Sequence, residues 1–359
     1  GAAARVDATA VARPFETYEG AAASYGEVPF QGGVLRDIYV APANAPKDGP
    51  VVYFIQGVFC GSVEGPTPEH PVRAFLQGLA ERGIASYRVE KPGMGDSAGP
   101  VECKDADFAT ELAAFRAGLD ALVKTRKIAP SRIVLFGHSM GGVEAPLLAA
   151  ERAGQLRGIA TMGTVLRPWR DYLGEVFWIQ GFLSSNADPV ESTEAGLAMR
   201  GLLDRIFIDK ASLATIAAGD PAEAQRLKDD LGWDGKNNFM GRSAPYWTGV
   251  NDQKLPRAWR DAKAPVLALY GESDFAAIDD RDHRLIVDIV NHYRPGTARY
   301  VLLEKTGHPL TLDGTRAEAA AKNEKAGGAT GAPLGPYNKD MTRIVADWIV
   351  ALPAPARSR

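Results

Sequence analysis

Short apolar runs alternate with amphipathic stretches along most of the chain. The run at residues 51–55 is apolar at every position, which is typical of a strand buried on both faces of a sheet. Similar runs predict strands at residues 34–41, 84–89, 132–136, 158–162, 265–270 and 299–304. Apolar positions three and four apart predict helices at residues 72–82, 108–124, 140–153, 281–293 and 339–351. Strands that alternate with helices predict an α/β fold, in which a parallel sheet is covered by helices.

This alternation is interrupted between residues 166 and 262, where the sequence is polar and helical in pattern. The interruption contains five of the six tryptophans of the chain: Trp169, Trp178, Trp233, Trp247 and Trp259. The simplest interpretation is one α/β domain, made of residues 28–165 and 263–359. Residues 166–262 would then form a helical cap, or lid, inserted into that domain.

Two other segments carry little hydrophobic pattern. Residues 1–27 are rich in alanine and are interpreted as an N-terminal tail. The printed sequence begins with Gly1 rather than Met, and two origins of this start stay open: a cloning remnant or a removed signal peptide. Residues 315–335 are rich in Ala, Gly and Lys and are interpreted as a mobile surface loop.

Composition excludes several classes of function. The 359 residues are 45% hydrophobic and 24% charged, as in an ordinary globular protein. Lys and Arg (41) nearly balance Asp and Glu (44), and no basic block offers a footprint for nucleic-acid phosphates. No apolar run approaches the roughly 18 residues of a membrane span. We therefore expect no nucleic-acid partner and no membrane span, and the sequence leaves the oligomeric state open.

Metal and cofactor sites are not predicted either. The two cysteines do not form a C-x-x-C motif, and the five histidines show no H-E-x-x-H spacing. Gly93 and Gly95 form a Gly-x-Gly pair, but no third glycine opens a helix as a dinucleotide site requires. The sequence therefore predicts chemistry carried by side chains alone.

The strongest chemical signal is the sequence Gly-His-Ser-Met-Gly at residues 137–141. It lies between a predicted strand and a predicted helix, which is the context of a nucleophile elbow. In such an elbow the serine occupies a sharp turn, and the helix N-terminus behind it favours developing negative charge. Ser139 is therefore the candidate nucleophile. His138 is its neighbour in sequence, but we expect its side chain to leave the elbow in another direction.

A serine hydroxyl needs a base, and the base needs an acid that orients it. His308 follows the strand predicted at residues 299–304, and Asp274 follows the strand predicted at residues 265–270. The order serine, acid, histidine along the chain is that of G-x-S-x-G enzymes. We therefore predict Asp274 and His308 as acid and base, with Asp279 and Asp280 as alternatives for the acid.

An oxyanion hole needs two backbone N–H donors beside the nucleophile. One is expected from Met140, the residue after Ser139. The other is expected from the loop at residues 56–62, with Val58 as the predicted donor and Phe59 as its alternative.

With these motifs, residues from about 24 to 351 resemble the α/β-hydrolase superfamily. The loop Lys-Pro-Gly-Met-Gly-Asp-Ser at residues 91–97 is similar to that family's Gly-x-Gly-x-Ser loop. Gln56-Gly57 departs from the pattern, because many members have His-Gly there. The resemblance implies an eight-stranded, mostly parallel sheet with the triad at its C-terminal edge, and it places residues 166–262 at the family's variable cap.

The same resemblance gives meaning to the cysteines. Cys60 and Cys103 follow strands that are neighbours in this fold, so both lie at one edge of the sheet. A disulfide between them and a pair of buried thiols both stay open. A disulfide would restrict the movement of the oxyanion loop. It would also favour a periplasmic or secreted location for the protein. Without a disulfide, the sequence assigns no cellular location.

The reaction expected from these residues is acyl transfer to water through an acyl-enzyme, with a carboxylic ester of a small molecule as substrate. Peptidase, lactonase, thioesterase and acyltransferase activities use the same residues and stay open, as does a non-catalytic module that binds small ligands. Trp169, Trp178 and Phe59 are the predicted substrate-binding residues. The alternative for the tryptophans is that all of them form the core of the cap.

Overall fold

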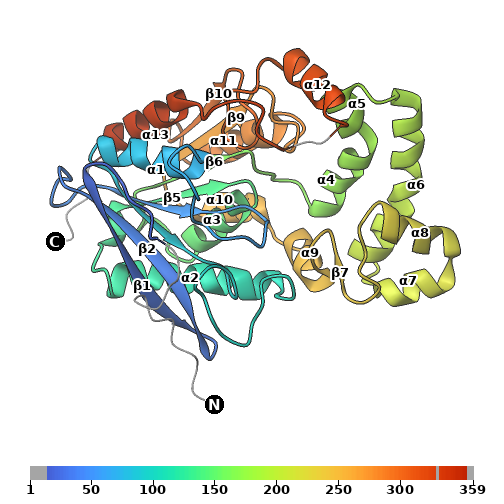
Figure 1. The fold of residues 1–359 in the computed structure, drawn as a ribbon, viewed down its shortest axis with the longest axis horizontal. Helices are drawn as coiled ribbons and strands as arrows, with labels where there is room; N and C mark the ends of the chain where they lie inside the picture. Colours follow the sequence, from blue (N-terminus) through green and yellow to red (C-terminus); the bar gives the residue numbers. More distant parts are fainter. Residues whose placement is uncertain (1–13, 329–330, 354–359) are drawn as a thin grey trace.

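The computed structural model describes residues 14–328 and 331–353. At its centre lies an eight-stranded sheet in the order β1-β2-β4-β3-β5-β6-β9-β10 (Figure 1). The strands are β1 (Ala21–Phe30), β2 (Gly33–Pro42), β3 (Val51–Ile55), β4 (Ala85–Val89), β5 (Ile133–His138), β6 (Gly158–Met162), β9 (Val266–Gly271) and β10 (Ala298–Leu303). Strand β2 pairs antiparallel with both of its neighbours, and the other pairs are parallel. The predicted eight-stranded, mostly parallel sheet is confirmed.

The sheet is covered by helices on both faces, which explains its continuous apolar runs. Every residue of β3, β4, β6 and β9 is buried. Val52 and Phe54 of β3 face α1 (Pro71–Glu81) and α13 (Lys339–Ala351), in one hydrophobic cluster. Val51, Tyr53 and Ile55 belong to the other cluster, with α2 (Phe108–Lys124), α3 (Gly141–Ala150) and α11 (Arg281–Tyr293). The period of two along β3 thus divides its side chains between the two cores.

Residues 163–265 connect β6 to β9, and we call them the β6–β9 segment. Its elements are α4 (Trp169–Glu175), a π-helical turn (Val176–Gln180), α5 (Gly181–Ser185), α6 (Pro189–Phe207), α7 (Leu213–Gly219), α8 (Pro221–Asp229), a hairpin of β7 (Asn238–Phe239) and β8 (Arg242–Ser243), α9 (Ala244–Asn251) and α10 (Leu255–Asp261). Helices α6, α7 and α8 lie at one end of the molecule, away from β1 and β2 (Figure 1). Helix α10 packs against α3 and α11, so the segment ends on the helical layer of the sheet.

Two segments differ from the sequence predictions. Residues 1–13 of the predicted tail lie outside the described residues, but the part from Ala21 onward is the edge strand β1. Most of its residues are at least partly exposed and only Val28 is buried, because an edge strand pairs on one side only and needs no apolar run. The predicted loop at 315–335 contains α12 (Arg316–Lys325). A capping box between Thr315 and Glu318 begins this helix.

Candidate active site

Ser139 lies at the turn between β5 and α3, with a backbone φ of 57°. L-residues rarely adopt this left-handed conformation, and it is strained for a serine. The two flanking positions must be glycine, because backbone carbonyl oxygens of neighbouring elements approach them closely. A β-carbon on Gly141 would lie 2.1 Å from the Ile55 carbonyl oxygen, and one on Gly137 would lie 2.3 Å from the Gly141 carbonyl oxygen. The Gly-x-Ser-x-Gly spacing therefore allows β5, β3 and α3 to converge at the serine.

The side chains of Ser139, His308 and Asp274 form a continuous chain of contacts. His308 Nε2 lies 3.0 Å from Ser139 Oγ. On the other side of the ring, Nδ1 lies 2.9 Å from Asp274 Oδ2 and 3.0 Å from Oδ1. Asp274 is fully buried, whereas the side chain of His308 is 17% exposed. Each residue follows the C-terminal end of a parallel strand, which brings the three together from positions far apart in sequence.

The environment favours an ionised Asp274 next to a basic imidazole. Burial alone would raise the pKa of Asp274, but the charge and hydrogen bond of His308 and the Ala277 amide lower it. Burial alone would lower the pKa of His308, but the Asp274 carboxylate raises it above its ordinary value. This arrangement can accept a proton from the serine and stabilise the resulting imidazolium.

The alternative acids are engaged elsewhere. Asp279 accepts a hydrogen bond from the Arg281 amide and forms an ion pair with its guanidinium. Asp280 pairs with Arg284 and accepts a hydrogen bond from the Tyr300 hydroxyl. Neither of these carboxylates is hydrogen-bonded to His308, and this favours Asp274 as the acid.

His138 has a contact that the sequence analysis did not foresee. Its Nε2 lies 2.7 Å from the backbone carbonyl oxygen of His308, and the two imidazole rings are 5.0 Å apart. Burial lowers the pKa of His138 to about 4, so its ring is neutral at pH 7 and donates the hydrogen bond from Nε2. His138 thus supports the loop that carries His308. Apart from adjacency to Ser139, no sequence signal indicated this contact.

The predicted oxyanion loop lies beside the nucleophile. A β-carbon on Gly57 would be 3.1 Å from Ser139 Cβ and 3.5 Å from Ser139 Oγ. The carbonyl of Val58 faces Arg242, which donates to it at 2.8 Å. Met140 is buried at the start of α3, and the side chain of Phe59 is 85% exposed. The donor roles of Met140 and Val58, and the substrate contact of Phe59, stay predictions.

The two predicted substrate-binding tryptophans have different surroundings. Trp169 is buried and stacks on Trp247, with their rings 4.9 Å apart. Trp178 is 40% exposed and donates from its indole nitrogen to the Thr193 hydroxyl. A hollow beside His308 is lined by other residues, including Phe275, Pro309 and Asn323. The acyl-binding role of both tryptophans stays a prediction. The buried position of Trp169 favours the alternative in which it belongs to the core of the cap.

The β6–β9 segment nevertheless contacts the loop that carries the acid. Gln180, two residues after Trp178, donates to the carbonyl of Phe275, which directly follows Asp274. The Tyr172 hydroxyl donates to the Ala276 carbonyl. These contacts place the start of the segment next to the triad.

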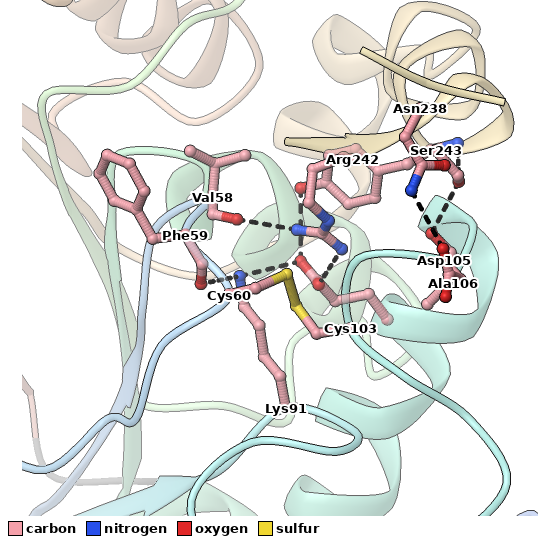
Figure 2. The surroundings of a disulfide bond; sticks show 12 residues. Val58, Phe59, Cys60, Lys91, Cys103, Asp105, Ala106, Asn238, Arg242 and Ser243 are labelled. Atoms are coloured by element: carbon pink, nitrogen blue, oxygen red, sulfur yellow. Dashed lines mark hydrogen bonds and ion pairs between the residues drawn. A yellow bond between two sulfur atoms is a disulfide. The ribbon is translucent and has the colours of Figure 1, made fainter. Parts of the chain in front are cut away.

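Cys60 and Cys103 are joined by a disulfide, with their α-carbons 5.7 Å apart (Figure 2). The bond connects the predicted oxyanion loop to the loop that precedes α2, across 43 positions of sequence. Within residues 14–328 and 331–353, no helix is long and apolar enough to cross a membrane. Over the same ranges, no group of three or more His, Cys, Asp or Glu side chains is arranged to hold a metal ion.

Comparisons with known proteins give a consistent result. The sequence profile of the alpha/beta hydrolase family matches residues 65–322. A search of curated protein sequences finds no match to the chain. Three similar solved structures share the fold at low sequence identity.

One is the esterase Pf2001 of Pyrococcus furiosus, with a TM-score of 0.55, 12% identity, and 95% of this chain and 96% of that chain covered. Another is the proline iminopeptidase of Mycobacterium smegmatis, with a TM-score of 0.54, 17% identity, and coverage of 91% and 98%. The third is Est1E of Butyrivibrio proteoclasticus, with a TM-score of 0.52, 16% identity, and coverage of 91% and 97%.

Proposed function

Since the chain belongs to the alpha/beta hydrolase family, we propose that it is a serine hydrolase that cleaves a carboxylic ester of a small molecule. The observation that carries this proposal is the continuous contact from Ser139 through His308 to Asp274. These contacts support the proposal, because nucleophilic catalysis by a serine needs a base within hydrogen-bonding distance and an acid that orients this base.

The reaction follows from these positions. His308 Nε2 takes the proton of Ser139 Oγ as the oxygen attacks the ester carbonyl. The backbone amides of Met140 and Val58 bind the resulting oxyanion. His308 then protonates the leaving alkoxide, and in the second half of the reaction it activates water to release the acid. Asp274 keeps the imidazole oriented and stabilises its charged form throughout.

Ester cleavage is preferred because it is the least demanding use of this apparatus. One of the proteins with the same fold, Pf2001, is described as an esterase, and another as a proline iminopeptidase, so aminoacyl substrates are the second class to examine. We propose that residues 166–262 form a cap that selects the acyl group, because they contact the loop of Asp274 through Gln180.

The test is labelling by a fluorophosphonate probe, combined with a panel of ester and aminoacyl substrates. The wild type should be labelled on Ser139, and Ser139→Ala should lose both labelling and turnover while keeping its melting temperature. Ser131→Ala, near the opposite end of β5, is the matched control and should behave as the wild type. Turnover of Ser139→Ala within tenfold of wild type would overturn the proposal. A wild type that binds ligands without being labelled would favour the non-catalytic alternative.

A further inference from the structure

Four buried ionisable side chains lie beneath the predicted oxyanion loop, and the mechanism above does not use them. Lys91 follows β4, Glu111 lies on α2, Glu144 on α3, and Arg242 on β8. Arg242 and Lys91 both form ion pairs with Glu111, the latter at 3.4 Å. Tyr246 stacks under the guanidinium of Arg242, 3.6 Å from ring centre to Cζ. Burying such a cluster costs free energy of folding, and this cost favours a functional role for its position near Ser139.

The two basic side chains also bind the oxyanion loop directly (Figure 2). Lys91 Nζ donates to the carbonyl of Phe59 at 3.2 Å. It also donates to the carbonyl of Gly57 at 2.6 Å. Arg242 Nη1 donates to the carbonyl of Val58, which lies between them. Three consecutive carbonyls of the loop are therefore held by two buried basic groups.

Only one of the two carboxyls, Glu111, is ionised. Lys91 and Arg242 therefore have more N–H donors than this carboxylate can accept. Burial alone would raise the pKa of Glu111, but Lys91 and Arg242 lower it. Burial and the neighbouring Glu111 raise the pKa of Glu144 well above its ordinary range. One ionised carboxylate thus faces two basic side chains, which have N–H groups left for the loop.

Holding a carbonyl also orients the next amide. In a trans peptide, the C=O of one residue and the N–H of the following residue point in opposite directions. Lys91, by binding the Gly57 carbonyl, directs the Val58 N–H away from itself. Arg242, by binding the Val58 carbonyl, does the same for the Phe59 N–H. These two amides are the candidate oxyanion donors of the loop, and Gly57 places the loop against Ser139.

We propose that Lys91 and Arg242 are positioning residues that fix the oxyanion loop in its donor orientation, and that Arg242 makes the β6–β9 segment part of this site. The inference rests on the proposed function. Arg242 is presented by the β7–β8 hairpin, which is docked by two further bonds: Ser243 Oγ to the Ala106 carbonyl and Asn238 Nδ2 to Asp105 Oδ1, each 3.0 Å long. The disulfide at Cys60 anchors the loop on its other side.

The test measures binding of an aryl trifluoromethyl ketone, because Ser139 converts such a ketone into a hemiketal whose oxyanion occupies the hole. The ketone carbon gains the bond to Ser139 Oγ, its C=O pair moves to oxygen, and the serine proton passes to His308. Arg242→Met should weaken ketone binding and lower kcat by roughly tenfold or more, with KM for the ester little changed, since losing one oxyanion donor costs 10²–10³ in kcat. The pH midpoint of kcat/KM should stay at the wild-type value, because the triad is not touched.

Removal of Arg242 leaves Glu111 with one fewer partner, so a second pair of variants guards against loss of folding. Glu111→Gln keeps both donors to the loop and should bind the ketone within about threefold of wild type, whatever its melting temperature. The double variant Arg242→Met, Glu111→Gln lacks the guanidinium and the carboxylate together, and should lose ketone affinity relative to Glu111→Gln.

Equal ketone affinity in Glu111→Gln and the double variant would overturn the inference while the proposed function stands. A wild type that neither hydrolyses esters nor binds the ketone would overturn the proposed function, and the inference with it.

Discussion

The α-carbon of Gly163 lies directly against the carboxylate of Asp274. A β-carbon at this position would be 2.6 Å from Asp274 Oδ2 and 2.8 Å from His308 Nδ1. Gly163 also has a φ of 67°, which side chains rarely allow. The residue that follows β6 therefore has to be glycine for Asp274 and His308 to meet.

Gly163→Ala should consequently separate Asp274 from His308. We expect kcat/KM to fall by about 100-fold, because displacements near 1 Å in a catalytic constellation have costs of this order. Gly174→Ala on α4 is the matched control, since a β-carbon there has nothing within 4 Å. Kinetics and thermal melting of both variants check the prediction, and unchanged activity of Gly163→Ala would contradict it.

The activity should depend on a histidine whose pKa is raised. Only neutral His308 can accept the serine proton, so kcat/KM should fall as the pH drops through a midpoint above about 6.5, the ordinary value for histidine. Asp274→Asn removes the charge that raises this pKa, so it should lower the midpoint and cut kcat by roughly 10⁴.

Asp279→Asn is the control for this pH profile, because that carboxylate pairs with Arg281 instead. A flat profile between pH 5 and 8 would exclude His308 as the base. A larger loss in Asp279→Asn than in Asp274→Asn would show that the acid is misassigned.

The surroundings of the two tryptophans predict different effects of mutation. Trp169→Ala should leave a cavity beside Trp247 and lower the stability by about 3–5 kcal/mol, with a uniform loss of activity. Trp178→Ala removes a half-exposed ring from the turn that contacts the loop of Asp274, so it should change the ranking among short, long and aromatic acyl esters. Initial rates on that ester series, with melting temperatures, distinguish the two. An unchanged ranking in Trp178→Ala would remove it from the acyl site.

The disulfide should contribute to stability. Its loop of 43 positions predicts about 3–4 kcal/mol from the restriction of the unfolded chain. Reductant should therefore lower the denaturation midpoint of the wild type and leave that of the double variant Cys60→Ser, Cys103→Ser unchanged. Alkylation of unfolded, unreduced protein gives a direct check by mass, since two adducts would show that both thiols are free.

Glu90 should make the protein less stable at alkaline pH. Its carboxyl is buried and contacts Ser62 and the Val63 amide, and burial raises its pKa to about 7. Because the folded state binds this proton more tightly than the unfolded chain, the stabilisation is complete below about pH 4.5 and is lost as the pH rises through about 7.

Glu90→Gln resembles the protonated carboxyl, so it should match the wild type at pH 5 and exceed its stability at pH 8 by up to about 3 kcal/mol. Glu81→Gln, exposed at the end of α1, controls for the change in net charge. Equal pH dependence of wild type and Glu90→Gln would contradict the assignment.

Much of the sheet could be predicted from the sequence because its central strands are buried on both faces. Val51–Ile55 and Gly158–Met162 have the same limits in the structure as in the prediction, since every position there is buried and all but Thr161 are apolar or aromatic. The half-exposed edge strand β1 has no such requirement and was interpreted as a tail. Helix α12 is largely polar, although its capping residues, Thr315 and Glu318, are a readable signal.

Some contacts of the candidate site could likewise be predicted from the sequence, and others could not. Ser139, Asp274 and His308 each follow a recognisable strand, and the structure brings them into contact. The partners of Arg242 and His138 could not be predicted, because neither contact belongs to a recognisable motif that would relate residues so far apart in sequence. Nothing in the local sequence of β8 indicates that it lies beneath the loop of Val58.

That contact limits how the protein can be re-engineered. Exchanging residues 163–265 for the corresponding segment of another hydrolase is an obvious route to new substrates. A donor segment without an arginine equivalent to Arg242 would remove the guanidinium that binds the Val58 carbonyl and would leave Lys91 as the remaining ion-pair partner of Glu111. Successful chimaeras should therefore retain the β7–β8 hairpin of this chain, or replace Glu111 and the loop at residues 56–62 together with the segment.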